Sequence, residues 1–505
     1  MNRRSFIHQL PTLTIASTLL PKLSLASSSK KKYTRYVAQN IDYLTLSFPS
    51  DKRVPIALTA FPVPEANATQ LTRLRFPPVN VEDDTLYFRI TAAIDFREEK
   101  TIRMYLPDSG QEIGLLNIKY AHPFQPFQIT ADPQWLPEIN RQGIALQMTE
   151  GTQTPWFFLP DQLPSDAIGL APQLITGNKS ASEKEFLRTL YSMNSFSPFG
   201  WMGGSVQDAL YELHRQGQSR ATQTLEMHLH HYLDEQQGII LESPRTQPLD
   251  GTFNSIEDFL PFAAIVNLYP DHPSVQKAVN YCRDHRNEQG IILAGKHITT
   301  EGCYTVAYPL ATIAQVRKDA ELAQIALDQL RHRSRYLVDE LAVYQRSALS
   351  GEKAYRNWGR GVAWYLLGTI KTLAAVRSGS FNLSGTDEVQ QSFVAAALMA
   401  NRWKNSEYLW YSYLDQPATE VDTSASAGIA AAIMWGVQLG VLPTHYRRSA
   451  QATYRSLQDD LTPDGFLTHV SQINRGGETL QKEGYRVISQ FGMGLMGQLK
   501  AALNA

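Results

Sequence analysis

The sequence predicts a multi-domain protein with a β-sandwich over residues 33–164, a linker over 165–182 and an all-α (α/α)6 barrel over 183–505. Three observations lead to this prediction. The chain has 505 residues, which is more than one ordinary hydrophobic core covers. Apolar residues alternate with polar ones in the first part and recur at helical spacing in the second. Proline-rich sequence, FFLPDQLPSDAIGLAPQL, separates the two parts.

The N-terminus has the features of an export signal. Arg3 and Arg4 resemble the paired arginines of a twin-arginine signal, and a short apolar stretch, Leu13–Leu25, follows them. This stretch is shorter than the ~20 residues of a spanning helix, which argues against an uncleaved membrane anchor. We expect residues 1–26 to be a signal peptide cleaved after Ala26. The mature protein is then expected to be periplasmic or secreted, with no membrane attachment.

The strand-rich part contains five segments in which apolar and polar residues alternate, separated by Pro, Asn, Asp and Gly. They read IDYLTLSF, VPIALTAF, TLYFRITAAID, TIRMYLP and GIALQM. This alternation is typical of strands with one buried face, and it predicts the sandwich. Aromatic residues on such a domain either bind sugar or pack against a neighbouring domain, and the sequence leaves both roles open.

The second part has helical periodicity to its end. Short turns and longer segments alternate between the predicted helices, as six helical hairpins in series require. In a closed (α/α)6 barrel the longer segments gather at one end, where the N-termini of inner helices surround a bowl that favours polar or anionic ligands. The twelve predicted helices lie near 183–191, 203–216, 219–235, 255–269, 273–286, 303–317, 319–337, 361–377, 386–403, 423–440, 444–460 and 486–502.

The composition excludes several kinds of partner. With 47 basic and 48 acidic side chains the chain lacks the charge excess of nucleic-acid-binding proteins. The two cysteines are expected to be buried thiols. His228 and His231 share a helical face, but no acidic or cysteine partner stands at metal-binding spacing, so we expect no metal. Phosphate-loop and dinucleotide motifs are absent from the sequence, and we expect no cofactor.

The segment NWGRGVAWYLLG begins a predicted helix, so we expect Arg360 at the rim of the bowl, with Trp358 and Trp364 on either side of it. A forked cation beside flat apolar rings suits a sugar ring with a carboxylate. Spacing alone equally fits an arginine that caps carbonyl groups beside two core tryptophans.

This segment resembles the W-x-R-G-x-x-W motif of unsaturated glucuronyl and rhamnogalacturonyl hydrolases, glycoside hydrolase families 88 and 105. Four further segments, GWMGGSVQDALYELHRQG, SIEDFLPFAAIVNLY, EGCYTVAYPLATIAQV and EVDTSASAGIAAAIMWGVQLGVL, are similar to motifs of these families in the same order. The resemblance covers roughly residues 185–505 and leaves out the strand-rich part.

The resemblance implies an exported glycoside hydrolase that acts on oligosaccharides left by polysaccharide lyases. These families hydrate the 4,5 double bond of an unsaturated uronic acid, with one acidic side chain as acid and base. The acid/base position of the family falls on Glu301, where the family has Asp, and the orienting carboxylate falls on Asp258, or on Glu257 if the match is displaced by one residue.

Arg360 and Trp364 match the family's substrate-gripping residues, and Trp201 matches an aromatic residue of the bowl wall. We also expect Trp358 and His297 to contact substrate; His297 precedes Glu301 in a predicted loop. The expected partner is an oligosaccharide, and the protein is expected to be a monomer or a homodimer. Two alternatives stay open: an inverting glycosidase or phosphorylase of saturated glycans, and a carbohydrate-binding relative without catalysis, which the Asp-to-Glu change would favour.

Overall fold

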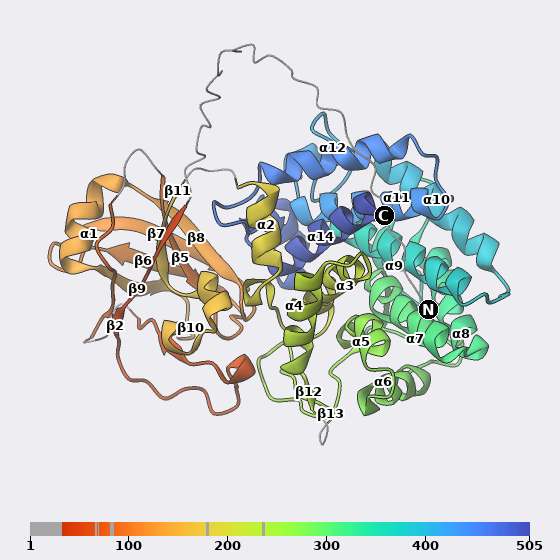
Figure 1. The fold of residues 1–505 in the computed structure, drawn as a ribbon, viewed down its shortest axis with the longest axis horizontal. Helices are drawn as coiled ribbons and strands as arrows, with labels where there is room; N and C mark the ends of the chain where they lie inside the picture. The colour runs from red at the N-terminus through yellow and green to blue at the C-terminus, as the bar shows by residue number, and fades with distance from the viewer. Residues whose placement is uncertain (1–32, 66–67, 69, 81–84, 178–180, 235–237) are drawn as a thin grey trace, which may run out of the picture. The chain divides into compact units, whose positions relative to one another are not determined.

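The first part of the described chain consists mainly of strands and the rest mainly of helices, as the change in hydrophobic period predicts (Figure 1). The computed structural model describes residues 33–505 apart from 66–67, 69, 81–84, 178–180 and 235–237. The signal peptide predicted at 1–26 lies outside the described residues. Among the residues described, no helix combines the length and the apolar character needed to cross a bilayer.

Two larger antiparallel sheets, with strand orders β1-β11-β5-β8 and β2-β4-β9-β6-β7, and an antiparallel pair of short strands, β10-β3, form the strand-rich region. Side chains alternate along these strands: in β7, Ile113, Leu116 and Ile118 are buried while Glu112 and Asn117 face solvent. The buried side chains of both sheets belong to one hydrophobic core. The elements are β1 (Thr34–Val37), β2 (Asn40–Asp42), β3 (Ala60–Pro62), β4 (Thr72–Arg75), β5 (Thr85–Thr91), β6 (Glu99–Tyr105), β7 (Glu112–Lys119), β8 (Pro126–Ala131), α1 (Leu136–Gln142), β9 (Ile144–Glu150), β10 (Trp156–Phe158) and β11 (Gln173–Gly177).

Two sequence expectations need correction here. Part of the predicted linker, 165–182, is β11, which pairs with β1 and β5 inside a sheet, so its backbone groups are used in the ladder. Five residues beside a proline-rich stretch are too few to show an alternating pattern, which explains the error. The predicted strand at 41–48 extends only over β2, because residues 43–49 do not join a ladder.

Each of the twelve predicted helices overlaps a helix of the structure. The helices α3 (Trp201–Arg215), α5 (Phe262–Leu268), α7 (Tyr308–Arg317), α9 (Gly359–Ser378), α11 (Thr423–Gln438) and α14 (Gln490–Asn504) contact one another in this order, and α14 contacts α3. Six others each contact at least one of them: α4 (Ser219–His230), α6 (Pro273–Asp284), α8 (Ala320–Leu337), α10 (Thr386–Arg402), α12 (Tyr446–Gln458) and α2 (Glu183–Leu190).

Short elements occupy the connections between these helices. The predicted helix at 255–269 begins with a 3-10 turn, Ile256–Phe259, and the one at 303–317 begins with a π-helical turn, Cys303–Ala307. The remaining elements are β12 (Leu233–Asp234), β13 (Gly238–Ile239), β14 (His297–Thr299), β15 (Tyr344–Ala348), β16 (Lys353–Arg356), β17 (Val470–Ser471), α13 (Gly477–Lys482) and β18 (Arg486–Val487).

Glycines allow the first group of helices to approach closely. A Cβ atom at Gly368 of α9 would lie 2.2 Å from the carbonyl carbon of Cys303, and one at Gly494 of α14 would lie 2.5 Å from that of Ser205. Any side chain at these positions would separate the helices. Gly368 therefore fixes the distance between α9 and the π-helical turn.

Buried ion pairs join the strand-rich region to the helical region. Arg89 of β5 donates through Nη1 and Nη2 to both carboxylate oxygens of Asp464, each at 2.7 Å, and both side chains are fully buried. Arg35 of β1 donates to the same carboxylate at 2.7 Å. Two guanidinium groups hold the pKa of Asp464 far below its usual range despite burial. The arginines of the strand-rich region and the aspartate of the helical region thus pair with each other and hold the two regions together.

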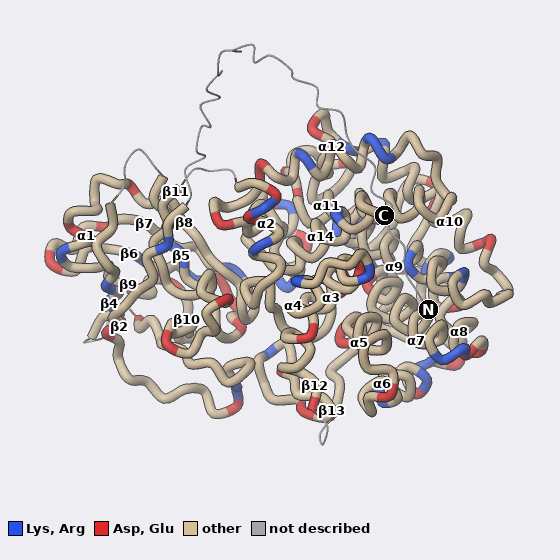
Figure 2. The backbone as a smooth tube through the Cα atoms, viewed as in Figure 1, with Lys and Arg blue, Asp and Glu red and all other residues tan. Residues whose placement is uncertain are grey.

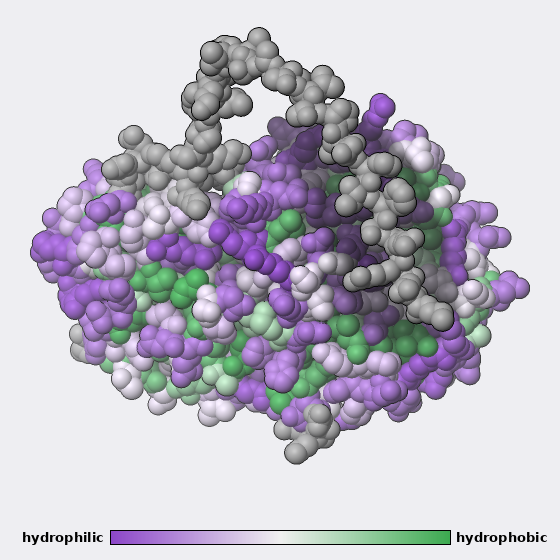
Figure 3. Space-filling view, in the orientation of Figure 1, coloured by the Kyte–Doolittle hydropathy of each residue, from purple (hydrophilic) through white to green (hydrophobic). Residues whose placement is uncertain are grey.

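Figures 2 and 3 show where charged and apolar residues lie. Figure 2 shows acidic and basic residues interspersed along both regions, as the near-zero net charge leads one to expect. On the face shown in Figure 3, hydrophilic residues separate the hydrophobic ones into small groups.

Candidate active site

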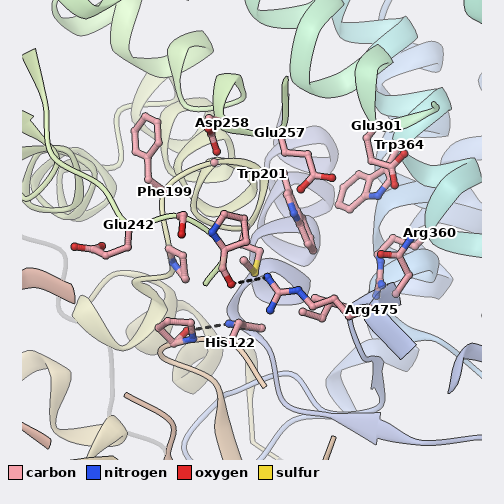
Figure 4. Close-up of a pocket in the computed structure, with 18 of the residues that line it drawn as sticks. His122, Phe199, Trp201, Glu242, Glu257, Asp258, Glu301, Arg360, Trp364 and Arg475 are labelled. Atoms are coloured by element: carbon pink, nitrogen blue, oxygen red, sulfur yellow. Dashed lines mark hydrogen bonds between the residues drawn. The ribbon is translucent and has the colours of Figure 1, made fainter. Parts of the chain in front are cut away.

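One cavity is lined by residues of both the helical and the strand-rich regions (Figure 4). It is lined by six of the seven predicted site residues, namely Trp201, Asp258, Glu301, Trp358, Arg360 and Trp364. They lie at or near the starts of α3 and α9 and in the turns that lead into α5 and α7. Helix starts that are far apart in sequence therefore meet at one place, as the predicted bowl requires.

The seventh predicted residue, His297, is not among the residues that line this cavity. It lies in β14, where it is paired with Ala348 of β15, and its backbone exchanges hydrogen bonds with Ala294. The segment before Glu301 is thus a strand of a small sheet, and this pairing sets the position of His297.

Glu301 begins the helical segment that continues through the π-helical turn into α7. The amide of Gln345 donates to both of its carboxylate oxygens, each at 2.9 Å. Burial and the charge of Glu257 raise the pKa of Glu301 to about 7, although the Gln345 amide and Arg360 oppose this rise. A carboxyl with a pKa near neutrality both gives and takes a proton at physiological pH, which is what acid/base catalysis needs.

Asp258 and Glu257 follow the cap of the 3-10 turn. The backbone N–H groups of Asn254 and Ser255 donate to Oδ2 of Asp258 at 2.6 and 3.1 Å, which completes a capping box with Ser255. Burial raises the pKa of Asp258 to about 7 and also raises the pKa of Glu257. Figure 4 shows Glu257 between Asp258 and Glu301. Of the two acids, Glu257 is therefore the one that faces Glu301.

Arg360 lies deeper than its predicted position at the rim. Its side chain is buried, and its Nη1 and Nη2 atoms donate to the carbonyl oxygens of Ser471 and Gln472 at 2.6 and 2.8 Å. The guanidinium also lies over the rings of Trp358 and Phe491, at 4.7 and 5.1 Å. These contacts correct the predicted location and fit the capping alternative: Arg360 fixes the segment after β17 while it lines the cavity.

Three indole rings form part of the apolar wall. The Trp364 ring packs edge-on against Trp201 at 5.6 Å and stacks on Tyr304 at 5.6 Å. Trp358 is buried and donates through Nε1 to Gln481 at 3.2 Å. The indoles are held by neighbours of the helical region, so they offer a preformed surface to a sugar ring.

Sequence reasoning missed several residues of this site, including four whose side chains are ionisable or hold Glu301. Gln345 holds Glu301, while His122, Glu242 and Arg475 line the cavity. None of them stands at a fixed spacing from the helical motifs, so no sequence signal points to them. Their places depend on the pairing of β15 with its neighbours, and on connections of the helical region that contact the strand-rich region.

The part of the chain that matches a known family model lies in the helical region. Residues 300–503 match the model of glycosyl hydrolase family 88. The chain is 27% identical over 141 residues to the unsaturated rhamnogalacturonyl hydrolase YesR of Bacillus subtilis, a match that covers 27% of this chain and 38% of that protein. The predicted resemblance to families 88 and 105 is confirmed. These matches indicate an enzyme of the glycoside hydrolase class, as the sequence predicts.

Solved structures agree in fold. A family 105 glycoside hydrolase from C. acetobutylicum aligns with a TM-score of 0.54 and 15% identity, over 64% of this chain and 98% of that one. A possible family 105 member from Salmonella enterica aligns with a TM-score of 0.52 and 16% identity, over 65% of this chain and 85% of that one. At these identities the likeness concerns the fold alone.

Proposed function

We propose that this glycoside hydrolase removes the terminal 4,5-unsaturated uronic acid from oligosaccharides produced by polysaccharide lyases. The observation that carries the proposal is one cavity that holds Glu301 and Glu257, both with raised pKa, beside arginines and the indole rings. The family match and the curated relative, whose name states that it hydrolyses unsaturated rhamnogalacturonyl substrates, support the substrate class.

In the proposed mechanism Glu301 is both acid and base. Its carboxyl proton passes to C4 of the substrate's double bond, and the positive charge that develops is shared between C5 and the ring oxygen. The Glu301 carboxylate then takes a proton from the water that adds at C5, so the side chain returns to its protonated state. The resulting hemiketal opens and releases the remaining sugar. A pKa of about 7 supplies both protonation states near neutral pH.

We assign the orienting role to Glu257. The charge of Glu257 raises the pKa of Glu301, whereas one carboxylate oxygen of Asp258 accepts hydrogen bonds from the backbone of its own turn. Glu257→Gln is then expected to lower kcat by about 100-fold, because a misplacement of the reacting groups by about 1 Å costs that much. Asp258→Asn keeps an oxygen for the turn, so its effect on kcat is expected to be smaller. A larger fall in kcat for Asp258→Asn than for Glu257→Gln would give the orienting role to Asp258.

The test uses the ultraviolet absorbance of the substrate's double bond. Purified protein is expected to abolish this absorbance in unsaturated uronyl disaccharides, and Glu301→Gln is the matched control without the acid. Unchanged absorbance over a panel of lyase products would refute the proposal. Release of reducing sugar from saturated glycans would instead support an inverting glycosidase.

The wider architecture and location are part of the same proposal. The cyclic order of contacts from α3 to α14 supports a closed (α/α)6 barrel, and the two antiparallel sheets with a shared core support a β-sandwich. The Arg3-Arg4 motif supports export. Cell fractionation of the wild type and of a variant with both arginines changed to lysine tests export, since only the wild type should leave the cytoplasm.

A further inference from the structure

Part of the cavity wall comes from outside the region that resembles known hydrolases. His122 and Pro123 belong to the loop between β7 and β8, and both line the cavity. Tyr120 and Phe124, on either side of them, have left-handed φ values of 50° and 66°. Gln490 of α14 donates to the Phe124 carbonyl at 2.6 Å. The helical region thus holds this loop in a conformation that non-glycine residues rarely adopt.

His122 presents an acceptor without a partner. Its Nδ1 lies 2.8 Å from the Pro123 carbonyl oxygen, which only accepts, so Nδ1 carries the proton and Nε2 carries a lone pair. The side chain is fully buried, and Nε2 has no hydrogen-bond partner among the described residues. Burial lowers the pKa of His122 to about 4, so the ring is neutral at physiological pH. A buried acceptor of this kind is stabilised by a donor such as a sugar hydroxyl.

Arg475 presents a donor without a partner on the same cavity. Its Nη2 donates to the Pro244 carbonyl at 3.0 Å, while Nη1 is buried and unpartnered in the described part of the chain. Burial lowers the pKa of Arg475 only to about 10, so the guanidinium stays charged at neutral pH. Arg360 donates through both Nη1 and Nη2 to backbone carbonyls, whereas Arg475 has one Nη atom that can still donate to a ligand.

The strand-rich region fixes the segment that carries Arg475. Gln472 donates through Nε2 to the carbonyl oxygen of Lys119 at 2.7 Å, and its side chain lies 3.2 Å from that of Gln125. Arg97 donates to the same Pro244 carbonyl that Arg475 uses. Arg475 therefore lies where the segment after β17 and the loop at 242–246 are both tied to the sheets.

We propose that Arg475 binds the carboxylate of the acidic sugar through Nη1, and that His122 accepts a hydrogen bond from a hydroxyl of the same ligand through Nε2. The strand-rich region thereby completes the substrate site instead of serving only as packing. This inference rests on the proposed function for its ligand, an oligosaccharide with a terminal uronic acid. A guanidinium in a partly desolvated site binds a carboxylate by charge-assisted hydrogen bonds, which are the stronger kind.

The experiment compares a uronyl disaccharide with its methyl ester, which lacks the charge. Arg475→Gln is expected to raise KM for the free acid at least tenfold with little change in kcat, and to leave KM for the ester unchanged. Arg475→Lys should recover part of the loss. The matched control is Arg245→Gln, because Arg245 is exposed and does not line the cavity. An equal rise for acid and ester would overturn the carboxylate role.

His122 and the dependence on catalysis are tested separately. His122→Asn keeps a donor for the Pro123 carbonyl but lacks the acceptor at the position of Nε2, so it should weaken binding of acid and ester alike. Unchanged binding of both would overturn the role of His122. Calorimetric binding of a saturated glucuronyl disaccharide to wild type and Arg475→Gln gives the same comparison without turnover. If the wild type leaves the absorbance of the unsaturated substrates unchanged but binds the saturated disaccharide more tightly than Arg475→Gln does, only the proposed function is refuted. If the wild type and Arg475→Gln bind that disaccharide equally, this inference is refuted.

Discussion

Replacing Glu301 by Gln should remove catalysis and stabilise the protein at alkaline pH. Loss of a general acid/base lowers kcat by about 100- to 10,000-fold. The pKa of Glu301 is raised from 4.5 to about 7 in the folded state. The folded protein therefore binds this proton more tightly than the unfolded chain does. The contribution of this proton to the free energy of unfolding is fully present below pH 4.5 and is lost as the pH rises through 7.

The size of this effect follows from the shift in pKa. A shift of one pKa unit corresponds to about 1.4 kcal/mol, so the rise from 4.5 to about 7 corresponds to about 3 kcal/mol. Gln does not titrate, and its side-chain oxygen still accepts from the Gln345 amide. The free energy of unfolding of Glu301→Gln minus that of the wild type should therefore grow between pH 4.5 and pH 8, by about 3 kcal/mol in total.

Urea denaturation at several pH values measures this difference, and the absorbance assay measures turnover on the same preparations. The two readouts should move in opposite directions at pH 8, with the inactive variant the more stable. Parallel stability curves for the two proteins would show that Glu301 does not bind its proton more tightly in the folded state. The assignment of the acid/base role would then lose its physical basis.

Three further changes test other parts of the structure. Gln345→Leu removes the amide that lowers the pKa of Glu301, so the alkaline limb of the kcat profile should move to higher pH, as a pH titration of turnover would show. Asp464→Asn leaves Arg89 buried without its carboxylate and should cost about 3–5 kcal/mol in urea denaturation, with unchanged stability as the contrary result. Gly368→Ala should destabilise the protein by about 1–3 kcal/mol and lower kcat by displacing the π-helical turn; a wild-type melting temperature and kcat would contradict this.

The helices and the helical wall of the site could be predicted from the sequence because both depend on local patterns. Helical periodicity is repeated over many residues, and the motifs of the family stand at the starts of helices, so their order gives their positions. Asp258, Glu301, Arg360 and Trp364 line one cavity for this reason. The short strand β11 gave no such signal, because its place in the sheet depends on β1 and β5.

Exposure and hydrogen bonding of individual side chains could not be predicted in the same way. Arg360 was expected at a rim, but its environment depends on two carbonyl groups over 110 residues further along the chain. His122 meets the site only because the strand-rich region packs against the helical one, and the segment that carries Arg475 is held by contacts with both regions. Such contacts are non-local, and a pattern within one segment does not contain them.

The strand-rich wall bears on catalysis as well as on recognition. Burial is the largest cause of the raised pKa of Glu301, Glu257 and Asp258. The residues that line the cavity exclude water from these acids, and His122 and Pro123 of the strand-rich region are among them. If these residues were absent, the acids would be more hydrated and their pKa values would fall toward the ordinary range for carboxyl groups. Glu301 would then be largely ionised at neutral pH and a poor proton donor, so the proposed acid catalysis depends on the packing of the two regions.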